Sequence, residues 1–180
     1  MIYNYKEIIE KYKSDYNLKK ALDSKEIYKI EEGLYSDYPC ISFLGKIVKK
    51  YPYGVISGLS AYYFYGFTDV IPEKIIMCTN RNATNINNDD IKQIRMKDEL
   101  YKLGITKKEY EGTTINIYNK ERLLIDLARN KNNIGYDLYK EIVLKYRKII
   151  DDLDMNLIEE YLNYFNNSNR IYKILMDEVF

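Results

Sequence analysis

The chain has 180 residues, with 28 lysines and arginines, 27 aspartates and glutamates, and no histidine. The lack of histidine excludes Ser-His-Asp and Cys-His nucleophile systems, HExxH zinc sites and histidine pH switches. The net charge of +1 argues against a polycation that coats nucleic acid or anionic lipid without selectivity. Cys40 and Cys78 form no CxxC pair, as suits a reducing cytosol. The N-terminal segment is too charged for a signal peptide and no apolar run could span a membrane, so we expect a cytoplasmic protein with no membrane partner.

The beginning of the chain predicts two short helices followed by a β-hairpin. Apolar side chains at helical spacing predict a helix over 5–13, and a second, shorter helix is expected over 17–23. The apolar positions of the second helix face inward, so Lys19 and Lys20 point outward. Alternating residues around a glycine-containing turn then predict a hairpin over 27–35.

The rest of the chain has a longer, mixed pattern. The expected elements are a helix over 41–50, a helix capped by Ser57 and running to about Tyr65, strands near 74–79, 91–96 and 113–118, a helix capped by Asn119, and helices over 136–149, 155–165 and 169–178. This order predicts an α+β fold, with an N-terminal module at 1–37 and an α/β domain at 41–180. Residues 151–180 form a helical tail that is acidic, with 2 basic and 7 acidic side chains.

Few residues are candidates for catalysis. Asp152 and Asp154 have the spacing of a metal-binding carboxylate pair, but a phosphoryl-transfer site needs further carboxylates and a phosphate-cradling loop. The sequence has neither GxxxxGK[ST] nor GxGxxG. The simpler interpretation is that these aspartates favour the N-terminal end of the next helix through its dipole. We therefore expect no enzyme activity, no metal and no cofactor.

The N-terminal module has the order of a compact winged helix-turn-helix, in which a second helix enters the major groove and nearby groups hold phosphates. The expected DNA-binding residues are Lys19, Lys20 and Lys25 on or beside the second helix, with Lys13 on the approach and Lys29 on the wing. The wing turn carries Glu31-Glu32, which should repel phosphate. A secondary basic patch is expected on the outward face of helix 41–50, at Lys46, Lys49 and Lys50.

Three segments carry a resemblance to a known family: IEEGLYS (30–36), YPYGVISGLSAYYFYGFTDVIPEKIIMCTN (51–80) and TTINIYNKERLLIDLAR (113–129). With these motifs in this order, the sequence resembles the AbiEi-type antitoxins, which are the antitoxin and transcriptional-regulator component of type IV toxin–antitoxin systems in abortive phage infection. The match spans roughly residues 20–130, over half of the chain.

The resemblance implies a DNA-binding repressor of its own operon that counters a nucleotidyltransferase-like toxin. It implies a winged helix that binds inverted repeats in the promoter DNA, with the contact region at Lys13–Lys29, and an α/β domain that carries the antitoxin activity. The segments Ser57–Asp69 and Glu121–Arg129 fall in that domain, where they look architectural rather than catalytic.

Two other interpretations stay open at this point. One is a protein-interaction module whose degenerate winged helix no longer binds DNA, and which neutralises a toxin or scaffolds a phage-defence complex by contact. The other is a metal-dependent enzyme built on Asp152 and Asp154. Promoter inverted repeats would favour the DNA-binding regulator over the interaction module.

Overall fold

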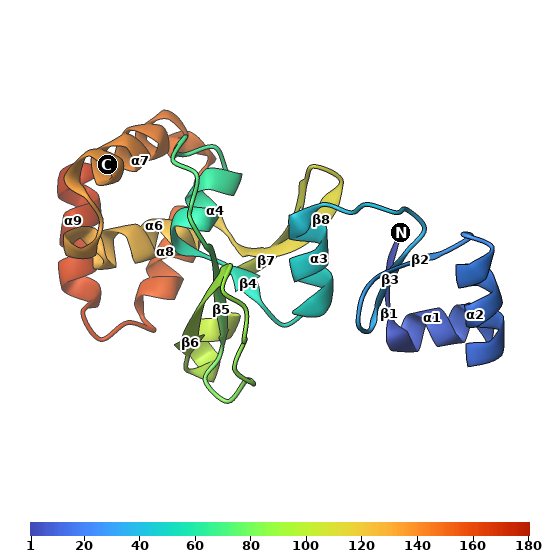
Figure 1. Cartoon of the computed structure of the whole chain (residues 1–180). Coiled ribbons are helices and arrows are strands. Elements are labelled where there is room, and N and C mark those ends of the chain that lie inside the picture. Colours follow the sequence, from blue (N-terminus) through green and yellow to red (C-terminus); the bar gives the residue numbers. More distant parts are fainter. The chain divides into compact units, whose positions relative to one another are not determined.

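A computed structural model describes all 180 residues as a mixed α+β protein with two separate β-sheets (Figure 1). The chain divides into two compact units. The N-terminal unit contains Met1–Tyr53 together with Glu111–Thr114, and the C-terminal unit contains Gly54–Tyr110 and Ile115–Phe180. The first division therefore falls after residue 53 and not at the expected 37–41. The reason is that the helix over 43–50 packs against the first strand of the chain.

The N-terminal unit contains three strands and three helices. They are β1 (Ile2–Asn4), α1 (Tyr5–Tyr12), α2 (Asp15–Asp23), β2 (Tyr28–Glu31), β3 (Leu34–Ser36) and α3 (Phe43–Lys50). The strands form one sheet in the order β1-β3-β2, with both pairings antiparallel. β1 was not expected from the sequence. It makes the hairpin part of a three-stranded sheet by pairing Tyr3 with Tyr35.

Local signals fix the two helices that precede the hairpin. Asn4 and Glu7 form a capping box at the start of α1, and Ser14 caps α2 by accepting from the backbone N–H of Asn17. The core of the unit is small, so its stability depends on a few apolar contacts. Its buried members are Ile8, Leu18, Ala21, Ile27 and Tyr35.

The C-terminal unit holds the second sheet and six of the helices. Its strands are β4 (Val55–Ile56), β5 (Ile75–Asn80), β6 (Ile91–Met96), β7 (Ile105–Tyr110) and β8 (Thr113–Tyr118). Its α-helices are α4 (Gly58–Phe64), α5 (Asp98–Lys102), α6 (Lys120–Arg129), α7 (Tyr136–Lys148), α8 (Met155–Leu162) and α9 (Ser168–Glu178), with short 3-10 turns η1 (Lys131–Asn133) and η2 (Ile150–Asp152). None of the helices has the length and apolar character needed to span a lipid bilayer.

The sheet of this unit has the order β6-β5-β4-β8-β7. β4 is only two residues long, yet it is the central strand: it pairs antiparallel with β5, where Val55 lies opposite Cys78, and parallel with β8, where Ile56 lies opposite Ile117. β5 and β6 run parallel. The turn between β7 and β8 has positive φ at Glu111 and Gly112, as in tight hairpin turns.

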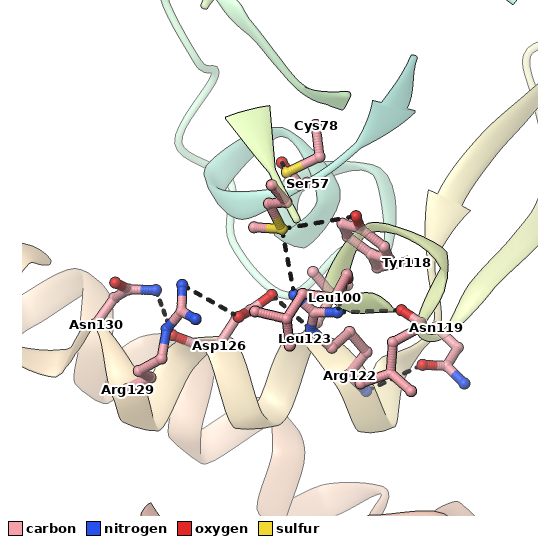
Figure 2. Close-up of polar contacts among 12 residues, drawn as sticks. Ser57, Cys78, Leu100, Tyr118, Asn119, Arg122, Leu123, Asp126, Arg129 and Asn130 are labelled. Atoms are coloured by element: carbon pink, nitrogen blue, oxygen red, sulfur yellow. Dashed lines mark hydrogen bonds and ion pairs between the residues drawn. The ribbon is translucent and has the colours of Figure 1, made fainter. Parts of the chain in front are cut away.

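Helix α6 is buried almost all round, because α4, α8 and α9 pack against it (Figure 1). Two of its buried residues are charged, and Figure 2 shows them as neighbours: Arg122 donates from Nε to Oδ2 of Asp126 at 3.1 Å. The Arg122 guanidinium also donates to the backbone carbonyls of Leu100 and Leu103 at 2.6 and 3.2 Å. An exposed pair at this spacing contributes only a few tenths of a kcal/mol, but a buried pair is strongly destabilising when one partner is removed.

The structure tests the two expected caps, Ser57 and Asn119, and the expected place of Asp154 at a helix N-terminus. Asn119 caps α6 by accepting from the backbone N–H of Arg122, and Asp154 caps α8 by accepting from that of Leu157. Ser57 precedes α4 as expected, but its side chain makes no capping bond. Instead its hydroxyl accepts a hydrogen bond from the buried Cys78 thiol at 3.2 Å. Burial raises the pKa of Cys78 to about 11, so this thiol stays protonated at neutral pH.

Candidate nucleic-acid interface

The second helix of the N-terminal unit, α2, presents one apolar and one polar face. Leu18 and Ala21 are buried against the core of the unit, which turns Lys19 and Lys20 to the surface. Neither ammonium group has a carboxylate within ion-pair distance. The ammonium groups of both lysines are therefore available to bind an external anion.

A lysine also stands at each end of α2, and both have an unusual backbone conformation. Lys13 has φ +65° in the two-residue connection from α1, and Lys25 has φ +59° just after the helix. Both are exposed and form no ion pair. Residues 13–25 contain four lysines and two aspartates, so the helix and its ends carry an excess of two positive charges.

The aromatic residue Tyr16 belongs to the same exposed face and is not among the DNA-binding residues expected from the sequence. Its side chain is 66% exposed, and the ammonium group of Lys20 lies 4.7 Å from the ring centroid. Helical spacing alone places Tyr16 and Lys20 one turn apart, so the signal was present in the sequence. Tyrosine accounts for 21 of the 180 residues, so one more tyrosine on a helix did not by itself indicate a binding surface.

The hairpin β2–β3 follows α2 and carries Lys29 and the two glutamates of its turn. Lys29 is exposed on β2 opposite Tyr35, without an ion pair, and Glu32 is exposed in the turn. Glu31 is different, because it forms ion pairs with Lys46 at 2.5 Å and Lys50 at 2.9 Å on α3. Of the two turn glutamates, only Glu32 therefore presents an unbalanced negative charge.

The expected secondary basic patch on α3 is not a free cationic surface. Lys46 and Lys50 pair with Glu31, and Lys49 pairs with Glu7 of α1 at 2.6 Å. Periodicity placed these lysines on the outward face of their helix, but the partners come from elements that are distant in sequence. The three lysines bind α3 to the rest of the N-terminal unit, and their charge is largely balanced.

These ion pairs change the titration of the two carboxylates. Burial alone would raise the pKa of Glu31, but hydrogen bonds from Lys46 and Lys50 outweigh it, and the net pKa is lowered. Burial likewise opposes the lowering at Glu7, where the Lys49 ammonium and the Asn4 backbone N–H favour the ionised form and lower the pKa. Both carboxylates are thus held ionised.

The cations of the N-terminal unit therefore fall into two groups. Those on α3 are paired within the protein, as is Lys11 with Asp37, whereas the following are exposed without a carboxylate partner: Lys6, Lys13, Lys19, Lys20, Lys25 and Lys29. Two acidic neighbours of α2 are engaged by tyrosines, since Asp15 accepts from the Tyr5 hydroxyl and Glu26 from that of Tyr12. Such a surface can hold phosphate oxygens through ammonium groups and place an aromatic ring beside them.

Comparison with known proteins yields a similarity of fold. The chain is similar to the crystal structure of the RV2827C protein from Mycobacterium tuberculosis, with a TM-score of 0.63 and 12% sequence identity over 99% of this chain and 72% of that one. At this identity the likeness concerns the fold alone. No family model matches the sequence. The search of curated proteins also finds no match.

Proposed function

We propose that this protein is a cytoplasmic DNA-binding regulator: the antitoxin of a type IV toxin–antitoxin system and the autorepressor of its own operon. The observation that carries the proposal is the topology of the N-terminal unit. A strand, two helices and a hairpin, with the sheet order β1-β3-β2, support the proposal of a winged helix, in which α2 would be the recognition helix and β2–β3 the wing. Lys19 and Lys20 lie on α2, Lys13 and Lys25 flank it, and Lys29 lies on β2, where phosphate contacts are expected.

The antitoxin part of the proposal rests on the resemblance to the AbiEi-type antitoxins. In this view the C-terminal unit carries the antitoxin activity, and its partner is a nucleotidyltransferase-like toxin. The burial of segment Glu121–Arg129 fits an architectural role, because all of its residues from Arg122 to Ala128 are buried. The proposal assigns no catalytic step to this chain, no cofactor and no metal.

The test is a mobility-shift assay on the DNA upstream of the protein's own gene, repeated at several stated salt concentrations. We expect a specific complex on a fragment that contains inverted repeats, with affinity that falls steeply as salt rises. A scrambled-repeat fragment of equal length is the control. If folded protein binds neither fragment at low salt but still neutralises a co-expressed toxin, the interaction-module interpretation replaces the DNA-binding one.

A further inference from the structure

A cavity of about 400 Å³ lies entirely within the C-terminal unit. Helices α4, α6 and α7 and strands β5 and β6 contribute its walls, and most of its lining is apolar, including Leu59, Ile76, Ile94, Leu138 and Ile142. Its size and lining are typical of pockets for small molecules, which are concave, mainly apolar and equipped with a few polar groups. None of the functions considered above uses this cavity.

The polar groups of the cavity gather near the C-terminal end of α6. Asp126 lines the cavity and is 7% exposed, and its Oδ2 accepts from Arg122, as drawn in Figure 2. Its second oxygen, Oδ1, is buried and accepts no hydrogen bond. Arg129 forms an ion pair with Oδ1, with Nη2 at 3.8 Å. Buried carboxylate oxygens are nearly always hydrogen-bonded, so Oδ1 could take a donor group of a ligand, whereas an acidic group would have to bind the cations of the cavity.

Two neighbouring residues hold the Arg129 side chain in place, but its N–H groups donate no hydrogen bond within the protein. Asp126 attracts its guanidinium from one side, and the ring of Phe165 lies 5.3 Å from the guanidinium carbon. The side chain is 36% exposed and donates no hydrogen bond within the protein. A guanidinium group offers five N–H donors in a planar fork, which matches the oxygens of a carboxylate, phosphate or sulfonate.

A second cation stands at the same cavity. Lys92 is exposed on β6, lines the cavity and forms no ion pair. The charged side chains that line the cavity are Lys92, Arg129 and Asp126; with Arg122 behind Asp126, they carry an excess of two positive charges. An apolar cavity with a net positive rim favours a ligand that has an apolar body and one anionic group.

We propose that this cavity binds a small organic anion, with its aromatic or aliphatic body among the apolar walls and its acidic group on Arg129 and Lys92. The acidic group is a carboxylate or a phosphate, since both fit the guanidinium fork. Asp126 acts as a positioning residue that orients Arg129. The proposal is independent of DNA binding by the N-terminal unit.

The experiment uses two fluorescent probes of similar shape on the full chain. The first, 8-anilinonaphthalene-1-sulfonate, is anionic, and the second, N-phenyl-1-naphthylamine, is its neutral counterpart. We expect saturable binding of both probes by the folded protein. Arg129→Gln or Lys92→Gln should weaken binding of the anionic probe by roughly fivefold while changing that of the neutral probe less than twofold. Arg170→Gln, at an exposed arginine of α9 outside the cavity, is the matched control.

A second pair of variants tests the location. Leu138→Trp fills the cavity from α7 and should abolish binding of both probes, whereas Leu144→Trp, on the exposed side of the same helix, should leave binding unchanged. Competition by decanoate or by 1-naphthyl phosphate then distinguishes carboxylate from phosphate ligands. Thermal unfolding of each variant checks that it is folded. The proposal fails if folded wild-type protein binds neither probe, if Leu138→Trp binds both normally, or if Arg129→Gln weakens the two probes equally.

Discussion

Gly104 lies directly against Arg122: a β-carbon built on Gly104 would stand 2.7 Å from the Cβ of Arg122 and 2.7 Å from Oδ1 of Asn119. The backbone of Gly104 also has φ +78°, and its carbonyl accepts from the N–H of Asn119 at 2.7 Å. The start of α6 and the chain before β7 thus approach as closely as backbone and side chain permit. Only glycine satisfies both the conformation and the space.

The variant Gly104→Ala should therefore be strongly destabilised. The positive φ alone makes alanine unfavourable by about 1–2 kcal/mol, and the overlap with Arg122 and Asn119 adds about 1–3 kcal/mol. Gly66→Ala is the matched control, because Gly66 has φ +72° but nothing within 4 Å of its β-carbon. Urea unfolding should show a clearly larger loss for Gly104→Ala, and equal losses for the two variants would contradict the steric argument.

Removal of the Asp126 carboxylate tests how much the buried Arg122–Asp126 ion pair affects the stability of the protein. We expect Asp126→Ala to destabilise the protein by about 3–5 kcal/mol, because it leaves the Arg122 guanidinium buried without its counter-ion. Asp98→Ala breaks an ion pair of the same spacing with Lys102 that is exposed to solvent, and it should change stability by less than about 1 kcal/mol. Chemical denaturation of both variants measures the difference. Similar losses would mean that burial of the pair has little effect.

Acid should loosen the N-terminal unit through Glu7 and Glu31. Their pKa values are lowered from 4.5 in the folded state, so the ionised forms stabilise the fold above that value, and this stability is lost as pH falls through the folded pKa. The double variant Glu7→Gln/Glu31→Gln should be less stable at neutral pH and should lose less stability on acidification. Glu10→Gln, at an exposed site of α1 without an ion pair, should keep the wild-type dependence. Thermal unfolding midpoints between about pH 7 and about pH 3.5 provide the measurement.

Lys19→Ala/Lys20→Ala should weaken promoter binding and flatten its salt dependence. Each ammonium–phosphate contact contributes roughly one unit to the slope of log affinity against log salt, so the slope should fall by about two units. Stability should change by less than about 0.5 kcal/mol, since both side chains are exposed. Lys140→Ala/Lys148→Ala, on exposed positions of α7, is the charge-matched control. An unchanged slope on DNA that the wild type binds would exclude α2 as the contact surface.

Glu32, and not Glu31, is the residue to substitute in order to test whether the hairpin turn contacts DNA. Glu31→Lys would place three ammonium groups together, because Glu31 is the partner of Lys46 and Lys50, and it should destabilise α3. Glu32 is exposed in the turn and has no such partners. If the turn approaches the DNA backbone, Glu32→Lys should tighten binding, because a repulsive charge is replaced by an attractive one, and the one new ammonium–phosphate contact should steepen the salt slope by about one unit. A mobility-shift series in salt detects the change.

Most of the longer elements could be predicted from apolar spacing and caps, because those signals are local. The helices α1, α2, α6 and α7 and the strands β6 and β8 lie within about two residues of their predicted bounds. The strands β1 and β4 are three and two residues long, too short for any periodicity, and they are strands only because β3 pairs with β1, and β5 and β8 pair with β4. Strand β7 was missed because none of its six positions is fully buried and three consecutive residues, Lys107, Lys108 and Glu109, are charged.

Helical spacing predicts which side chains of a helix are exposed, and this part of the candidate interface could be predicted from the sequence. The outward position of Lys19 and Lys20 needed only the buried residues of the same helix. The pairing of Lys46 with Glu31 could not be inferred, since it depends on how α3 packs against the hairpin. The burial of Arg122 has the same cause, because the carbonyls that satisfy its guanidinium come from residues near 100.

The division of the chain has a consequence for synthesis on the ribosome. The N-terminal unit consists of the first 53 residues together with Glu111–Thr114, which are the turn of the β7–β8 hairpin and the first two residues of β8. At roughly 5–20 residues per second, that turn is made about 3–12 s after Tyr53. During this interval α3 lacks the neighbour that Thr113 supplies beside Gly45. The N-terminal unit therefore receives its last residues only when the β7–β8 hairpin is made, although its first 53 residues are translated earlier.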